Sequence, residues 1–207
     1  TRPDKKPVSS DVLREELKKA DKILKQTLGV NHINGLRTPL GYSHMALAGN
    51  KEVLQALKDA KLLYVSSSLR SRDWGINAPL QENGEERQPF IYFNDVVEVP
   101  SHGWQDTAFT GTSKTQGTEN YPTTQRDIVA HYTSLINEAE KLASNGRKIY
   151  LGLCMHPWAV RRYDSNLEAI TGLLDLAQEK GIVATSYGKA ASEGLENDSE
   201  RLQREYS

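Results

Sequence analysis

Residues 148–155 read KIYLGLCM, a nearly continuous apolar run that is followed at once by His156, Pro157 and Trp158. An apolar run of this kind, without alternation of polar residues, is typical of a strand in a parallel sheet that is covered on both faces. The stretch therefore predicts a buried strand with a histidine and a tryptophan directly behind its end.

Amphipathic helices and short apolar strands alternate on both sides of this run. Helices are predicted from Ser10 to Leu28, over 51–60, from the capping box Thr124–Asp127 to Gly146, and from the capping box Ser165–Glu168 to Gly181. Further strands are predicted over 62–67, 90–99 and 182–186, and loops over 36–41, 70–89 and 101–121. Such alternation predicts an α/β fold with a mainly parallel sheet. No repeat divides the chain, so we predict one domain over 10–195, a linker or mobile arm at 1–9 and a charged tail at 196–207.

The composition excludes several classes of protein. The chain has 207 residues with 26 Lys and Arg against 27 Asp and Glu, a balance that argues against binding nucleic acid or a membrane surface by bulk charge. The mean hydropathy is −0.61, and the apolar runs are far shorter than the ~20 residues of a membrane span. The single cysteine, Cys154, excludes an internal disulfide and is predicted to be buried and inert.

Few arrangements in the sequence suggest a cofactor site. Among the five histidines, no pair has the His-x-x-x-His spacing that places two imidazoles on one helical face. His32, His44 and His102 are predicted to lie in loops, exposed to solvent. The chain has no glycine-rich phosphate loop and no Gly-x-Ser-x-Gly nucleophile elbow. The sequence alone therefore builds no metal, phosphate or serine-hydrolase site.

Three loops near predicted strand ends hold residues that are suited to chemistry. His156 is a candidate general acid or base, because its ordinary pKa is near neutrality. Asp73 is a candidate to orient such a histidine, and Arg37 is a candidate to clamp a carboxylate. Each has an ordinary alternative: a structural histidine, a surface aspartate and a surface ion pair. The three tryptophans fall in loops, where they either stack against sugar rings or plug the loops onto the core: Trp74, Trp104 and Trp158.

Taken in order, these loops resemble three motifs of the polysaccharide deacetylase superfamily, the metal-dependent carbohydrate esterases. The family's Arg-x-Pro-x-Gly loop is similar to residues 35–41, GLRTPLG, and its Asp-Trp motif is similar to Asp73-Trp74. Its apolar strand that runs into a histidine is similar to residues 149–156, IYLGLCMH. The resemblance covers about 10–190 and implies a distorted (β/α) barrel.

The resemblance implies a role for each matching residue. His156 would be the general acid that protonates the leaving amine, Asp73 its charged partner, and Arg37 the residue that holds the catalytic base. In the loop that holds Arg37, the backbone N–H of Leu40, next to Pro39, would help to stabilise the oxyanion. Trp74 would wall the acetyl pocket. Pro39, Leu40 and the three tryptophans are therefore the predicted substrate-binding residues.

Two of the family's motifs are missing from this sequence. These are the Asp-Asp pair and the His-x-x-x-His motif, which supply the base and the metal ligands. The resemblance thus implies a divalent metal, zinc in the first instance, with ligands expected from a segment upstream of residue 1, so that the barrel in this chain lacks its first strands. A complementing N-terminal segment or a homo-oligomer would then complete the fold. The alternative is a branch of the family that has lost the metal.

The substrate class stays open between several functions. The first is a hydrolase that removes an acetyl or similar acyl group from an amide on a carbohydrate, an N-acetylated glycan. The strand at 63–67 and the exit at 98–100 are more similar to the allantoinase-like branch, which acts on small amides. A non-catalytic carbohydrate-binding module that uses the tryptophans, and a bare α/β scaffold or partner subunit, are the alternatives from other classes.

Overall fold

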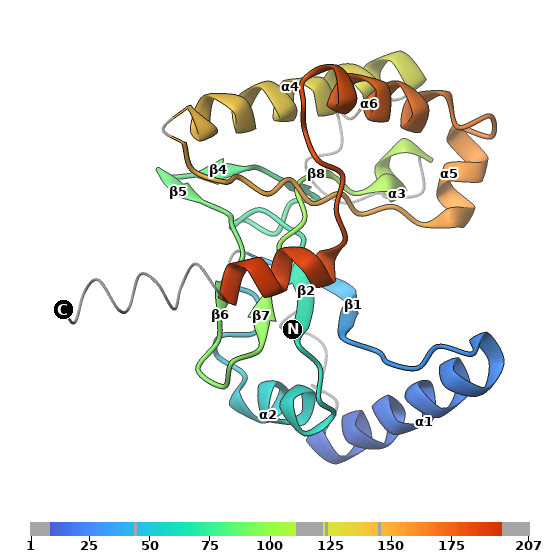
Figure 1. Cartoon of the computed structure of the whole chain (residues 1–207), viewed down its shortest axis with the longest axis vertical. Helices are drawn as coiled ribbons and strands as arrows, with labels where there is room; N and C mark the ends of the chain where they lie inside the picture. The colour runs from blue at the N-terminus through green and yellow to red at the C-terminus, as the bar shows by residue number, and fades with distance from the viewer. Residues whose placement is uncertain (1–8, 44, 111–121, 123, 145, 196–207) are drawn as a thin grey trace. The chain divides into compact units, whose positions relative to one another are not determined.

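The computed structural model of this chain describes residues 9–43, 45–110, 122, 124–144 and 146–195 (Figure 1). Its contacts divide the chain into two compact units. The first unit comprises Thr1–Ser68, Pro89–Val99 and Tyr187–Ser207, and the second comprises Leu69–Gln88 and Pro100–Ser186. The chain therefore passes between the units several times, where a single domain over 10–195 was expected.

The first unit is built on a four-stranded mixed sheet in the order β1-β2-β7-β6. Its strands are β1 (Gly35–Tyr42), β2 (Tyr64–Ser68), β7 (Val97–Glu98) and β6 (Phe90–Ile91). β1 and β7 both run parallel to β2, with Gly35 opposite Tyr64 and Val97 also opposite Tyr64. β6 pairs antiparallel with β7. The predicted α/β class is thus confirmed in this unit, with parallel pairing at the centre of the sheet.

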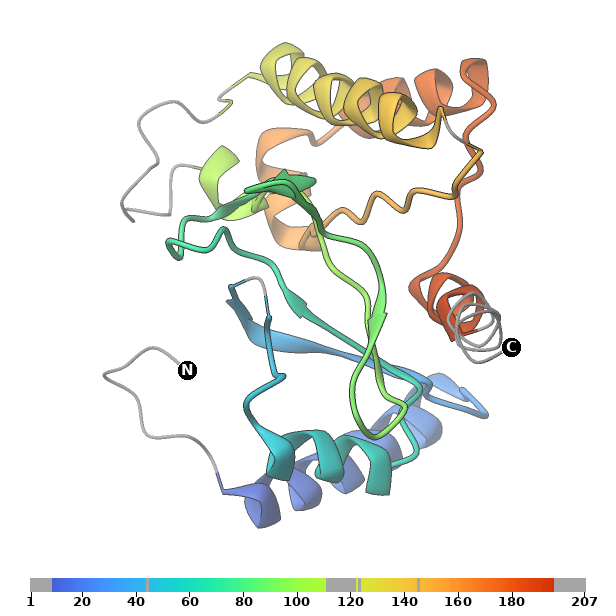
Figure 2. The ribbon, with the colours of Figure 1, turned by 90° about the vertical axis from the view of Figure 1, so that its left-hand side faces the viewer.

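Two helices with well-defined caps accompany this sheet. α1 (Ser10–Leu28) begins at Ser9, whose Oγ accepts the N–H of Val12, and ends at Gly29 in the left-handed conformation with φ 64°. α2 (Lys51–Asp59) is capped by Asn50 and lies beside α1 (Figure 2). Residues 187–195 form a further helical segment. The core of the unit gathers side chains of α2, β2 and the β6–β7 hairpin: Leu47, Leu54, Leu57, Leu62, Val65, Tyr92 and Val96.

The second unit is mostly helical. α4 (Gln125–Ala143) packs along α6 (Glu168–Glu179), while the short helices α3 (Asp106–Phe109) and α5 (Pro157–Tyr163) pack against each other (Figure 1). Two short antiparallel pairs complete it: β3 (Asn77–Ala78) with β8 (Gly103–Trp104), and β4 (Gln81–Glu82) with β5 (Glu85–Glu86). Its core includes Ile76, Leu80, Phe109, Ile128, Tyr132, Leu135, Ile136 and Leu173.

Gly103 of β8 shows why this unit closes tightly. Its φ of 80° is unfavourable for any residue with a side chain, and a Cβ there would come within 3.0 Å of Leu135, Tyr132 and His131 of α4. Glycine therefore lets β8 approach α4 closely, and this approach fixes the segment that leads into α3.

Some predicted elements differ from the structure. Residues 36–41, predicted to be a loop, form most of β1. This strand tolerates Pro39 for two reasons. β1 is an edge strand of the sheet that the structure describes, and the register of its pairing with β2 shifts between Arg37 and Tyr42. Residues 182–186, predicted to be a strand, have no regular secondary structure and are exposed.

The apolar run at 148–155 also joins no sheet within the described residues. Side chains take up its backbone hydrogen bonds: the N–H of Tyr150 donates to Gln88 Oε1 at 2.7 Å, and the N–H of Gly152 donates to His102 Nδ1 at 3.0 Å. The strand prediction was wrong because an apolar composition does not reveal whether a partner strand is present. Buried Cys154 agrees with its prediction.

The remaining expectations are settled only in part. The four predicted helices are confirmed as α1, α2, α4 and α6, although the helices predicted to end at Gly146 and Gly181 end at Ala143 and Glu179. The strand at 62–67 is confirmed as β2, while 90–99 divides into β6 and β7. The sheets are small and mixed, and none of them closes into a barrel within the residues that the structure describes. Most of the arm at 1–9 and all of the tail at 196–207 lie outside those residues. No described helix has both the length and the apolar character that a membrane span requires.

Candidate functional site

His156 and Asp106 form a paired imidazole and carboxylate in the second unit. His156 is the N-cap of α5, and Asp106 is the first residue of α3. Asp106 Oδ1 lies 2.9 Å from His156 Nδ1, and Oδ2 accepts the backbone N–H of His156. The Asp106 side chain is fully buried, whereas half of the His156 side chain is exposed. The pair therefore has one end inside the protein and one end in solvent.

This geometry assigns the tautomer of His156. An ionised carboxylate can only accept hydrogen bonds, so Nδ1 carries a proton and donates it to Asp106. Nε2 is then the atom that exchanges a proton with a ligand. A buried carboxylate behind an exposed imidazole also stabilises the imidazolium when Nε2 is protonated. The arrangement is suited to general acid–base chemistry at Nε2.

The segment in front of Asp106 is held by the neighbouring strands. The N–H of Gln105 donates to the carbonyl of Ile76 at 3.0 Å, and Gln105 Nε2 donates to the carbonyl of Leu69 at 2.9 Å. The Tyr132 hydroxyl donates to the carbonyl of Trp104 at 3.2 Å. Because the two residues before it are fixed, the Asp106 carboxylate has a defined direction without any contact to solvent.

Two aromatic residues of α5 lie near this pair. The ring of Trp158 is 5.9 Å from the His156 ring, tilted by 40°, and half of its surface is exposed. The ring of Tyr163 packs edge-to-face on Phe109 of α3, and its hydroxyl is buried without a hydrogen-bond partner in the described part of the chain. Burial and the nearby charges of Asp106 and Asp164 raise the pKa of Tyr163, so this hydroxyl keeps its proton.

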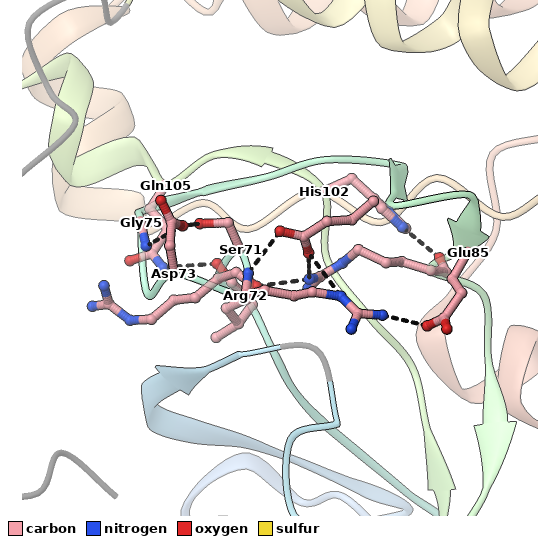
Figure 3. A network of polar contacts seen from close by, with 11 residues as sticks. Ser71, Arg72, Asp73, Gly75, Glu85, His102 and Gln105 are labelled. Carbon is pink, nitrogen blue, oxygen red and sulfur yellow. Dashed lines mark hydrogen bonds and ion pairs between the residues drawn. The ribbon is translucent and has the colours of Figure 1, made fainter.

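Asp73, the predicted partner of His156, has a local role instead. Its Oδ1 accepts hydrogen bonds from Ser71 Oγ and, at 3.3 Å, from the N–H of Gly75, so the carboxylate closes its own turn (Figure 3). The hydrogen bond from Ser71 is the main reason that the pKa of Asp73 is lowered. In the described residues the carboxylate that holds His156 is that of Asp106, which corrects the predicted pairing.

Trp74 is held in an unusual backbone conformation beside Asp73. Its φ is 68°, a region that is rare for a bulky residue. Its N–H donates to the carbonyl of Ser71, and its carbonyl accepts Arg70 Nη1, each at 3.0 Å. The indole is 40 % exposed, so Trp74 is available as a flat surface for a ligand. Trp104 is not: only 9 % of its surface is exposed, because its ring joins the core of the second unit.

Arg37, Pro39 and Leu40 lie on β1 of the first unit, whereas the other predicted site residues lie in the second unit. The guanidinium of Arg37 stands over the ring of Tyr187, 5.1 Å from its centre. The predicted roles of Arg37 toward a catalytic base and of Leu40 toward an oxyanion stay predictions.

His102, expected in an exposed loop, is fully buried. Its Nδ1 accepts the N–H of Gly152, so its Nε2 carries the proton and donates to the carbonyl of Arg87 at 2.7 Å. Burial is the main cause that lowers the pKa of His102 to about 4. This histidine is therefore neutral at physiological pH. Its role is structural, because its two ring nitrogens connect the backbone of Gly152 to that of Arg87.

A polar network surrounds the Asp73 turn. The N–H of Arg72 donates to Glu82 Oε1 at 2.8 Å, and its guanidinium pairs with Glu85 of β5 (Figure 3). These contacts join the turn to the β4–β5 hairpin. They fix the position of the turn that carries Asp73 and Trp74.

No group of three or more His, Cys, Asp or Glu side chains in the described residues is placed to hold a metal ion. The carboxylate of Asp106 is already engaged by His156, and that of Asp73 by Ser71 and Gly75. The described residues therefore supply no set of ligands for the metal that the resemblance implies, whose ligands are expected from a segment upstream of residue 1, and we assign no chemical step to a metal.

Sequence reasoning missed Asp106, the residue that completes the pair. It falls within 101–121, a stretch that its Ser, Thr and Gly content marks as a loop. The signal that could have found it is an acidic residue directly behind Trp104 and Gln105, at the start of a short helix.

Comparison of the chain with models of known protein families, with curated proteins and with solved structures found no match. The assignment of a function therefore depends on the geometry of the Asp106–His156 pair and on the motifs in the sequence.

Proposed function

We propose that this protein is a hydrolase of the polysaccharide deacetylase type, which removes an acetyl or similar acyl group from an amide on a carbohydrate. The observation that supports this best is the Asp106–His156 pair, a buried carboxylate behind a half-exposed imidazole. Such a pair supplies what amide hydrolysis needs most, a proton for the leaving amine. In this proposal the parallel strands of the first unit belong to a distorted barrel.

His156 acts as the general acid. Water adds to the amide carbonyl and gives its proton to the base that the resemblance expects from the upstream segment. The protonated Nε2 then donates its proton to the amide nitrogen as the C–N bond breaks, so that the amine leaves in neutral form. Asp106 keeps the ring in the orientation that presents Nε2, and its charge stabilises the imidazolium before the transfer. General acid catalysis of this kind contributes roughly 10²- to 10⁴-fold to the rate.

A carbohydrate substrate is favoured by Trp158. An exposed indole beside a general acid offers a flat apolar surface on which the face of a sugar ring can pack, and Trp158 is adjacent to His156. A small amide of the allantoinase-like kind would not need this surface. The same observation also supports the alternative of a non-catalytic carbohydrate-binding module, in which Trp158 and the strained, exposed Trp74 bind a glycan without turnover.

The divalent metal that the resemblance implies is a separate part of the proposal. Lewis-acid activation of water and of the carbonyl is what such an ion supplies when bound. Elemental analysis of the full-length protein, with the upstream segment that the resemblance expects to carry the ligands, before and after dialysis against a chelator, tests for it. About one equivalent of zinc or another divalent ion supports this part, and a metal content at background level contradicts it.

The role of the pair is tested by acetate release from an N-acetylglucosamine oligomer. We expect His156→Ala and Asp106→Asn each to lower kcat by about 10²- to 10⁴-fold, because one removes the acid and the other changes its tautomer. Asp73→Asn is the matched control, since the Asp73 carboxylate is exposed and engaged in its own turn, and we expect it to retain near wild-type kcat. Thermal melting of each variant separates loss of function from loss of fold.

Other outcomes would change the proposal. If Asp73→Asn abolishes activity and Asp106→Asn does not, the partner of the acid is Asp73. If His156→Ala is as fast as the wild type, His156 is not the acid. If no hydrolysis occurs but Trp158→Ala abolishes glycan binding, the binding module is the better description.

A further inference from the structure

The exposed face of α5 carries two arginines one helical turn beyond Trp158. Arg161 and Arg162 are both exposed, whereas Ala159 and Val160 between them and Trp158 are buried. Residues three and four apart on a helix are neighbours on its surface, about 5–6 Å between Cβ atoms. Trp158, Arg161 and Arg162 therefore form one continuous surface, which we call the α5 face, and His156 begins the same helix.

Neither arginine is neutralised within the described part of the chain. No carboxylate there lies within ion-pair distance of Arg161 or Arg162, although most other arginines of the second unit have such a partner: Arg72 with Glu82 and Glu85, Arg87 with Glu82, and Arg147 with Glu86. The nearest acidic residue along the chain, Asp164, is buried and accepts Gln125 Nε2 and the N–H groups of Ala169 and Ile170. The two guanidinium groups are thus adjacent like charges without a counter-charge among the residues that the structure describes.

We propose that the α5 face is a subsite for an anionic group of the substrate, a carboxylate or a phosphate on the sugar that stacks on Trp158 or on the sugar that follows it. One turn of helix advances about 5.4 Å, which is comparable to the length of one sugar ring. Guanidinium groups present paired N–H donors that match carboxylate and phosphate oxygens. The proposal rests on the proposed function for the reaction, and it adds that the preferred substrate is an acidic, N-acetylated glycan.

A purely structural role explains the two arginines less well. A cation near the C-terminal end of a helix is favoured by the helix dipole, and Arg161 and Arg162 lie in the last turn of α5. That effect is small for a helix of seven residues, and it does not account for two adjacent cations that flank an exposed tryptophan beside the pair of His156 and Asp106.

The test compares ligands that differ in charge. A neutral N-acetylglucosamine tetramer is compared with an oligosaccharide that alternates glucuronate and N-acetylglucosamine, and N-acetylglucosamine 6-phosphate is compared with N-acetylglucosamine. Binding is followed by tryptophan fluorescence or by calorimetry, and turnover by acetate release. We expect the wild type to bind each anionic ligand about tenfold more tightly than its neutral counterpart, with a preference that weakens at high salt.

Matched variants assign this preference to the α5 face. Arg161→Gln/Arg162→Gln removes the charge of both side chains and keeps them polar, and we expect it to abolish the preference while neutral ligands bind as before. Arg126→Gln is the control, because Arg126 is likewise exposed, on α4 of the same unit, and we expect it to keep the preference. A preference for the glucuronate oligomer alone identifies a carboxylate as the group, and one for the phosphosugar alone identifies a phosphate.

The outcomes separate this inference from the proposed function. Acetate release from the neutral tetramer without any preference for anionic ligands overturns the subsite and leaves the hydrolase intact. Arginine-dependent binding of an anionic ligand without acetate release from any substrate supports the subsite and removes the hydrolase. A preference that survives in Arg161→Gln/Arg162→Gln also overturns the subsite.

Discussion

Glu98 of β7 is a carboxylate that is buried completely and surrounded by hydrogen-bond donors of the first unit. Its Oε1 accepts the N–H groups of Ser67 at 2.7 Å and Ser68 at 2.8 Å, and its Oε2 accepts the hydroxyls of Ser67 at 2.6 Å and Tyr92 at 2.8 Å. Burial raises the pKa of Glu98 above its ordinary 4.5, although each of these hydrogen bonds opposes the shift. One side chain thus joins the end of β2 to β7 and to Tyr92.

The raised pKa of Glu98 predicts how stability depends on pH. Between pH 4.5 and the raised pKa, the unfolded chain loses this proton while the folded protein keeps it, so the free energy of unfolding falls as the pH rises through that interval. The contribution is fully present below pH 4.5 and is lost above the folded pKa. We expect Glu98→Gln, which is neutral at every pH, to flatten this slope.

Urea unfolding at a series of pH values measures the effect. The hydroxyls of Ser67 and Tyr92 can rotate to accept from the new amide, so we expect Glu98→Gln to fold. Glu86→Gln serves as the control, because Glu86 pairs with Arg147 in a largely exposed contact. An unchanged slope in Glu98→Gln would show that Glu98 carries the same charge in the folded and unfolded protein.

At the scale of elements, the two long helices of the second unit begin in different ways. α4 begins with the predicted capping box, in which Thr124 Oγ1 accepts the N–H of Asp127 at 3.1 Å. The predicted box Ser165–Glu168 does not cap α6. Instead, Asp164 Oδ2 accepts the N–H groups of Ala169 at 3.0 Å and Ile170 at 3.2 Å. The buried carboxylate of Asp164 therefore caps α6, from a position five residues before Ala169.

This difference predicts unequal losses of stability. Thr124→Ala removes a partly solvated cap and is expected to cost about 1 kcal/mol. Asp164→Ala leaves two buried N–H groups and Gln125 Nε2 without an acceptor, and we expect a larger cost of roughly 2–4 kcal/mol. Urea unfolding of both variants gives the comparison. Equal losses would mean that water replaces Asp164 at the start of α6.

Sequence patterns predicted the elements whose stability is local. The helices over 10–28, 51–60 and 125–143 have apolar periodicity and caps within their own residues, so the signal and the structure coincide. The run at 148–155 failed because its hydrogen bonds depend on Gln88 and His102, more than 45 residues away in the chain. The strand β1 was missed because Pro39 is typical of a loop. Proline is tolerated in an edge strand, and the sequence does not reveal that β1 is at the edge of the described sheet.

The candidate site was predictable to the same extent. His156 and Trp158 are two residues apart, directly behind the apolar run at 148–155, so a local pattern indicates both. Asp106 is 50 residues from His156, and no local pattern connects the two. The resemblance of Asp73-Trp74 to the family's Asp-Trp motif predicts Asp73 as the partner, but its short turn with Ser71 and Gly75 satisfies its carboxylate locally.

At the scale of the whole molecule, the chain builds two hydrophobic cores that share no residue. One gathers around Leu54, Leu57 and Val65 in the first unit, and the other around Ile128, Tyr132 and Leu173 in the second. Each unit combines segments that are far apart in the sequence, so neither corresponds to a continuous stretch of chain. Each core can nevertheless be weakened by a substitution within it.

Hydrogen exchange measured peptide by peptide tests whether the two cores open separately. Leu57→Ala and Ile128→Ala each remove a fully buried side chain, and each is expected to cost about 2–5 kcal/mol. If the cores are independent, Leu57→Ala accelerates exchange in α2 and β2 while α4 and α6 stay protected, and Ile128→Ala has the reverse effect. Each variant is the control for the other, because both cavities are apolar and of similar size. Equal acceleration in both units by either substitution would contradict this independence and would show that the chain unfolds as one cooperative body.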